Sequence, residues 1–170
     1  MDGASSAARV LASRLELEPH PEGGFYKRIY ESGNEFTLDD GRVRKYSTAI
    51  YFLLERGQYS AMHRIKSDEL WHHYAGSTLN VHEIFPDGTY KLHRLGKDLS
   101  AGERPFCAVT AGSWFGADIP DNGSFALVGC TVSPGFDFED FALADPKVLS
   151  ETFPQHRALI ETLAPKEDSP

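Results

Sequence analysis

The sequence predicts an all-β protein, a sandwich or barrel of short strands with helices only near the chain ends. Between residues 25 and 141, short runs of apolar, β-branched and aromatic residues alternate with turns rich in Gly, Pro, Asn and Asp. Helical periodicity is confined to the two ends of the chain. Among all-β folds a jelly roll fits this pattern, because it closes on itself and leaves an interior that can hold a small ligand.

The bulk composition is that of one globular domain. A chain of 170 residues with 41% hydrophobic and 12% aromatic residues is long enough to bury a sizeable core, so we expect a single domain over residues 1–170. The net charge of −8 argues against binding to a nucleic acid polymer or to an anionic membrane. Cys107 and Cys130 form neither a disulfide framework nor a zinc-binding spacing, so we expect two small buried residues.

The sequence also gives an expectation for location. It contains no apolar run long enough for a transmembrane helix, and residues 1–20 lack the apolar centre of a signal peptide. We therefore expect a cytoplasmic protein.

The first third of the chain predicts one helix followed by strands. Ser5 or Ser6 is the expected cap of a helix that ends before Pro19. Its apolar face is formed by four residues: Ala7, Val10, Leu11 and Leu15. The elements expected next are a turn at 20–24, a strand at 25–30, a loop at 31–44 and a strand buried on both faces at 45–54.

The remainder of the chain predicts further strands and a helical end. The expected strands lie at 77–85, 89–95, 106–110, 113–117 and 125–132, with the first two forming a hairpin. A turn at 133–135 precedes the segment 136–141. Helical periodicity follows Pro146 and Pro154, and we expect residues 166–170 to be frayed.

The stretch 57–76, GQYSAMHRIKSDELWHHYAG, concentrates more groups that can move a proton or hold a metal than any other segment. It predicts a strand, a turn and a second strand. Side chains alternate along a strand, so His63 and Ile65 share one face of the first strand, and Glu69, Trp71 and His73 share one face of the second. If the two strands pair, His63 and Glu69 point into one cavity.

The spacing of this stretch resembles the first sequence motif of the cupin superfamily. Gly57, His63, Glu69 and Gly76 match that motif, whereas Ile65 stands where a second His is usual. Three further segments, at 20–24, 47–54 and 128–138, resemble the small single-domain cupin type 5 family, together with 67–72. The resemblance covers about residues 8–163. It implies a cupin jelly-roll β-barrel (a double-stranded β-helix), a homodimer and a pocket inside the barrel.

The second cupin motif departs further from the usual pattern. In the matching stretch 110–115, Phe115 stands where the last metal-binding His is usual. With two of four ligands replaced, the chain resembles the metal-free sugar-nucleotide epimerase cupins. That resemblance implies an isomerase or epimerase acting on a carbohydrate-like or carbonyl-bearing substrate.

Within that reading, His63 is the expected general base, because its ordinary pKa lies near neutrality, and Glu69 is expected to orient it. Tyr26 or Tyr51 is the expected acid. Arg28 is expected to hold an anionic group of the substrate. The other expected binding residues are His20 and Glu22 in the Gly-Gly turn over the pocket mouth, with Trp71, His73, Trp114 and Phe115.

Three alternatives stay open at the level of sequence. His63, Glu69 and His73 are a possible ligand set for a divalent transition metal, since two imidazoles and a carboxylate suit zinc, iron or nickel. The same pocket in a binding module would hold a nucleotide or sugar without turning it over. In a purely structural protein, these histidines and carboxylates would be satisfied core or surface residues.

Overall fold

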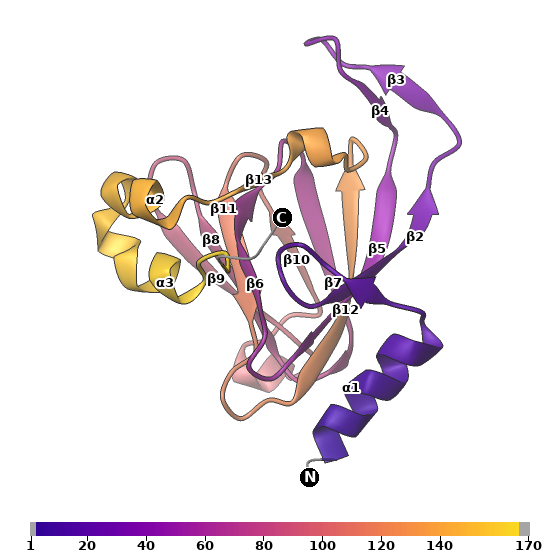
Figure 1. The fold of residues 1–170 in the computed structure, drawn as a ribbon, viewed down its shortest axis with the longest axis vertical. Helices are drawn as coiled ribbons and strands as arrows, with labels where there is room; N and C mark the ends of the chain where they lie inside the picture. Colours follow the sequence, from indigo (N-terminus) through magenta and orange to yellow (C-terminus); the bar gives the residue numbers. More distant parts are fainter. Residues whose placement is uncertain (1–2, 167–170) are drawn as a thin grey trace.

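Two antiparallel β-sheets face one another in the computed structural model, which describes residues 3–166 (Figure 1). The six-stranded sheet has the order β1 (Glu18–Pro19), β2 (Phe25–Glu31), β5 (Thr48–Glu55), β12 (Phe125–Ser133), β7 (Asp68–Gly76) and β10 (Phe106–Val109). The five-stranded sheet has the order β13 (Ala142–Leu143), β6 (Tyr59–Arg64), β11 (Trp114–Asp118), β8 (Leu79–Ile84) and β9 (Tyr90–Leu95). This architecture confirms the all-β prediction.

The helices lie at the two ends of the chain, as expected. Helix α1 (Gly3–Arg14) lies along the outer face of the six-stranded sheet, whereas α2 (Pro146–Thr152) and α3 (Arg157–Thr162) lie beside the other sheet (Figure 1). Within residues 3–166 there are also three short 3₁₀ helices: η1 (Leu99–Ala101), η2 (Phe138–Asp140) and η3 (Pro154–His156). No helix in the part of the chain that the structure describes is long and apolar enough to cross a membrane.

Burial of three apolar clusters explains how these layers hold together. The main core lies between the sheets and includes Phe52, Trp71 and Val128. A second cluster packs α2 and α3 against the five-stranded sheet, and a third packs α1 onto Leu53 and Leu127. Cys107 and Cys130 are both buried, as predicted.

Three local predictions were wrong. The predicted loop 31–44 contains strand β3 (Glu35–Thr37), and it ends in strand β4 (Val43–Lys45), with which β3 forms a separate hairpin. The predicted strand 45–54 is divided between β4 and β5. Helix α1 begins at Gly3, ahead of the serines that were expected to cap it. The segment 136–141, for which the sequence indicated no element, contains η2. The expected fraying of 166–170 falls on residues of which 167–170 lie outside the described part of the chain.

Strand β5 is an interior strand. It pairs with β2 on one side and with β12 on the other, so its backbone groups are used within the sheet. The apolar run there therefore gives no sign of an edge open to a second subunit, and the homodimer stays a prediction.

Strands β6 and β7 do not pair, contrary to expectation. The chain leaves the five-stranded sheet at Arg64 and enters the six-stranded sheet at Asp68, so the two strands face each other across the interior. His63 and Glu69 nevertheless point toward the same space, because each lies on the inward face of its own sheet.

Candidate functional site

A cavity of about 310 Å³ lies between the two sheets. Its walls come from strands β2, β5, β7 and β12 of the large sheet, from β6 opposite, and from the segment that follows β12. The lining residues are Glu18, His20, Glu22, Tyr26, Arg28, Thr48, Ile50, Phe52, His63, Ile65, Glu69, Trp71, Cys130, Val132, Phe136, Phe138 and Phe141. A cavity of this size, largely apolar with a few convergent polar groups, is the usual form of a small-molecule site.

The Gly-Gly turn places Glu22 inside the molecule. Gly23 has φ +108°, and a Cβ there would lie 2.2 Å from the backbone oxygen of Tyr59, so only glycine permits this close approach. The N–H of Ala61 donates to the carbonyl oxygen of Glu22 at 2.7 Å, which fixes the turn against β6. The turn thereby places His20 and Glu22 in the cavity wall, where both side chains are buried.

The carboxyl group that contacts His63 is that of Glu22, and not that of Glu69. Nε2 of His63 lies 3.0 Å from Oε2 of Glu22, and Nδ1 lies 2.7 Å from the carbonyl oxygen of Ala61. A carbonyl oxygen can only accept, so Nδ1 carries the ring proton and Nε2 is left as the acceptor. The imidazole ring of His63 packs against the ring of Phe115, with centroids 4.1 Å apart.

Burial keeps this pair uncharged. Burial, and then the nearby Glu69, raise the pKa of Glu22 well above its usual range, whereas burial lowers the pKa of His63 to about 4. The contact is therefore a hydrogen bond from a carboxylic acid to a neutral imidazole, and not an ion pair. The hydroxyl of Ser60 donates a further hydrogen bond to Oε1 of Glu22 at 2.8 Å.

Glu69 and His20 share this apolar environment. Burial raises the pKa of Glu69 to about 7 and lowers that of His20 to about 3, with His63 adding to the second shift. The backbone N–H of Glu22 donates to Nδ1 of His20 at 3.1 Å, so His20 is held as a neutral ring. Among the described lining residues Arg28 is the sole Lys or Arg, which leaves the two carboxyl groups without a buried cation.

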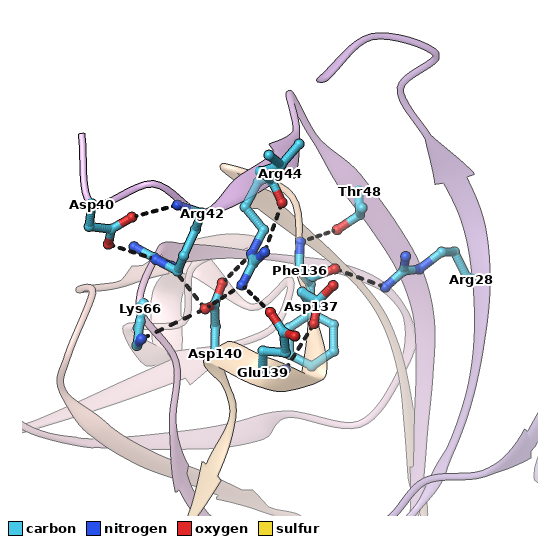
Figure 2. Close-up of polar contacts among 11 residues, drawn as sticks. Arg28, Asp40, Arg42, Arg44, Thr48, Lys66, Phe136, Asp137, Glu139 and Asp140 are labelled. Carbon is cyan, nitrogen blue, oxygen red and sulfur yellow. Dashed lines mark hydrogen bonds and ion pairs between the residues drawn. The ribbon is translucent and has the colours of Figure 1, made fainter. Parts of the chain in front are cut away.

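The open end of the cavity has a different character. Arg28 is partly exposed there and donates to Oε2 of Glu31 at 2.9 Å and to the carbonyl oxygen of Phe136 at 3.3 Å. Figure 2 shows Arg28 reaching the segment at Phe136. Phe138, which is 49% exposed, also lies at this end. A ligand would thus meet a cation and aromatic rings first, and titratable groups beyond them.

The structure brings part of the sequence-predicted set together. Those that line the cavity are His20, Glu22, Tyr26, Arg28, His63, Glu69 and Trp71.

Tyr51, His73, Trp114 and Phe115 lie outside the cavity. Tyr51 points to the opposite face of β5, against Tyr74, because neighbours along a strand alternate. His73 shares the inward face with Glu69 but lies four residues further along β7, roughly 13 Å away at the usual rise. Its Nε2 donates to the carbonyl oxygen of Ser77 at 2.9 Å.

Trp114 and Phe115, both expected to bind the substrate, lie in other parts of the molecule. Trp114 lies under the guanidinium of Arg64, 4.6 Å from its ring centroid, in a different groove. Phe115 is buried in the core behind His63 and so supports the site without lining it. His72 points outward and packs on Phe106, as expected from the alternation.

The proposed metal ligands are not assembled. His73 is absent from the cavity that His63 and Glu69 line, and within residues 3–166 no group of three or more His, Cys, Asp or Glu residues is placed to hold a metal ion. The two further positions of the usual cupin ligand set are apolar, with Ile65 on the cavity wall and Phe115 paired across from His63. These side chains do not fit a metal centre of the usual kind.

Several lining residues escaped the sequence reasoning. Thr48 and Ile50 share the inward face of β5 with Phe52, and Cys130 and Val132 share that of β12. Strand alternation was the available signal for them. Ser60 had no such signal, because its role depends on the position of Glu22 in a distant turn.

The comparisons with known proteins identify the family. The model of the Cupin superfamily (DUF985) matches residues 9–144, which is most of the chain. The chain therefore belongs to this cupin family, as the motifs predicted.

The chain is similar to two solved structures and to one further relative. A hypothetical protein from Leishmania major is 34% identical, with a TM-score of 0.89 over 94% of this chain and 99% of that chain. A protein from Shewanella oneidensis is 42% identical, with a TM-score of 0.86 over 94% and 98%. An uncharacterised protein of Saccharomyces cerevisiae is 27% identical over 79% of this chain and 74% of its own length.

Proposed function

We propose that this protein binds a small carbohydrate-like or carbonyl-bearing molecule and moves a proton on it, as an isomerase or epimerase does. The observation that carries the proposal is the buried Glu22–His63 pair facing the same cavity as Glu69. Clustered carboxyl and imidazole groups with shifted pKa values in a cavity are typical of proton-transfer sites.

The two carboxyl groups suit opposite tasks. A group whose pKa lies near the working pH is an effective general base, and Glu69, with a pKa of about 7, has this property. Glu22 keeps its proton and can donate it to the substrate. We therefore propose that Glu69 takes a proton from the carbon next to the carbonyl group, leaving the electron pair in an enolate, and that Glu22 gives its proton to the opposite face of the same carbon. Proton exchange with water then returns both carboxyl groups to their starting forms.

His63 has a revised role in this scheme. With a pKa of about 4 it is neutral at physiological pH, and its Nε2 accepts from the Glu22 carboxyl group. It thus holds the Glu22 carboxyl group and its transferable proton in place. At the open end, Arg28 is positioned to attract an anionic group of the substrate.

Hydrogen–deuterium exchange at carbon tests this proposal without knowledge of the product. The protein is incubated in D₂O with a panel of aldoses, ketoses and their phosphates, and deuterium next to the carbonyl group is measured by NMR. We expect exchange in at least one compound, and a loss of about 10²-fold or more in Glu69→Gln and in His63→Ala.

Tyr51→Phe is the matched control, because Tyr51 lies on the outer face of β5 and should leave exchange unchanged. Full exchange in both His63→Ala and Glu69→Gln would refute the proposed chemistry. Tight binding without exchange for any compound would instead identify a binding module, for which the aromatic walls formed by Phe52 and Trp71 are equally suited.

A further inference from the structure

Three phenylalanines form the wall at the open end of the cavity. Phe136, Phe138 and Phe141 contact one another edge to face, with centroids 5.0, 5.8 and 6.3 Å apart. Phe141 also reaches the buried end, where its ring lies 5.2 Å from that of His63. Access to the cavity from this side therefore depends on where this short segment sits.

The segment has little regular structure of its own. Its 3₁₀ helix η2 spans Phe138–Asp140, capped by Oδ1 of Asp137, which accepts from the N–H of Glu139 at 2.9 Å. At its start, the N–H of Phe136 donates to Oγ1 of Thr48 at 2.9 Å. A stretch with so few backbone partners has to be held in place by side chains.

Asp140 supplies the strongest of these attachments. Arg44, on strand β4, donates from Nε to Oδ2 at 2.8 Å and from Nη2 to Oδ1 at 2.9 Å, so the pair is bidentate (Figure 2). Arg42 adds a contact from Nη1 to Oδ1 at 2.9 Å, and Nζ of Lys66 lies 3.9 Å away. None of these four residues lines the cavity.

The attachment joins distant parts of the chain. Arg44 and Asp140 are 96 residues apart, and the β3–β4 hairpin that carries Arg44 projects beyond the two sheets (Figure 1). Asp140 precedes Phe141 directly and ends the 3₁₀ turn that begins with Phe138. Fixing its carboxylate in two directions therefore fixes the backbone that presents both rings.

We infer that Asp140 and Arg44 are positioning residues that hold the aromatic segment 136–141 across the open end of the cavity. They do not line the cavity, and act by fixing Phe138 and Phe141. Loss of the pair should let the segment swing away and admit solutes to the cavity. This inference concerns access alone, so it does not depend on the proton-transfer chemistry proposed above.

Acrylamide quenching of Trp71 measures that access directly. Trp71 lines the cavity and is 1% exposed, and Trp114 is the second tryptophan of the chain, so a Trp114→Phe background leaves one reporter. We expect Asp140→Asn in this background to raise the Stern–Volmer constant of Trp71 several-fold while the far-ultraviolet circular dichroism stays unchanged.

Glu139→Gln is the matched control. Glu139 also contacts Arg44, at 3.2 Å, but its side chain is 78% exposed and does not share the bidentate geometry. It should leave the quenching of Trp71 unchanged. Quenching that stays low in Asp140→Asn, together with a lower urea midpoint, would overturn the inference and show that the pair stabilises the fold alone.

Two variants keep the test decisive should Asp140→Asn fail to fold. Thr48→Val preserves the shape of the side chain and removes the acceptor for the N–H of Phe136. Phe138→Ala shortens the wall itself at a half-exposed position. We expect more quenching of Trp71 in both variants, and unchanged quenching in both would refute the positioning role.

Discussion

Glu22 and Asp140 are carboxyl groups with nearly equal exposed fractions and opposite behaviour. The first is 8% exposed and the second 7%. Burial and the neighbouring Glu69 raise the pKa of Glu22, whereas hydrogen bonds from Arg44 and Arg42 lower the pKa of Asp140. A low exposed fraction alone therefore does not decide whether a carboxyl group is charged.

The difference lies in the cations placed nearby. The buried end of the cavity contains carboxyl and imidazole groups with no Lys or Arg beside them, so neutral forms with exchangeable protons are favoured. The cluster around Asp140 has two arginines that satisfy its oxygens, so its charge is retained and serves as a fixed attachment. One region suits proton transfer and the other suits positioning.

The largest effect should come from breaking the charged region. Asp140→Asn removes the bidentate carboxylate from Arg44 and leaves Glu139 as its remaining carboxylate. Removing one member of a buried ion pair costs about 3 to 5 kcal/mol, and we expect a loss at the lower end of that range. Urea unfolding at pH 7 measures this loss. Glu139→Gln, at an exposed neighbour of the same arginine, should remain within about 0.5 kcal/mol of the parent protein. Equal losses of stability in Asp140→Asn and Glu139→Gln would show that the buried pair contributes no more than the exposed contact.

A smaller, pH-dependent effect should come from Glu69. Folding raises its pKa from 4.5 to about 7, so the folded chain holds the proton more tightly. The stability gained in this way is full below pH 4.5 and is lost as the pH rises through 7. Glu69→Gln lacks this dependence and should gain up to about 3 kcal/mol relative to the parent protein between pH 5 and 8.

Urea unfolding at four pH values across that range measures the difference for Glu69→Gln. Glu55→Gln, at a position outside the cavity, is a suitable control and should show no such trend. A constant difference between Glu69→Gln and the parent protein would mean that Glu69 is ionised throughout, as Asp140 is.

The smallest effect on stability should come from Glu22→Gln. A glutamine amide can donate to Nε2 of His63 and accept from Ser60, as the neutral carboxylic acid does. We expect a change of about 1 kcal/mol or less at pH 7, with loss of the deuterium exchange described above. A loss as large as that of Asp140→Asn would show that Glu22 is charged in the folded protein.

The sequence predicted the class of fold and part of the cavity. Alternation along 57–76 placed His63 and Glu69 toward one space, even though the expected pairing of the two strands was wrong. That result holds because side-chain alternation is fixed by the backbone of each strand, whichever sheet the strand joins. The same alternation accounts for Tyr26 and Arg28 on the cavity wall. It placed His73 on the correct face of β7, but His73 lies too far along the strand from Glu69 to line the cavity.

The sequence by itself determined the family, the all-β architecture and the loss of two usual metal ligands at Ile65 and Phe115. The tertiary structure alone decided that His63 is paired with Glu22 and that Arg44 is paired with Asp140. Each of these contacts joins segments from different strands and turns, and the pKa of a buried group depends on every charge that the fold brings near it. Local sequence patterns do not show which distant residues will lie next to a buried group.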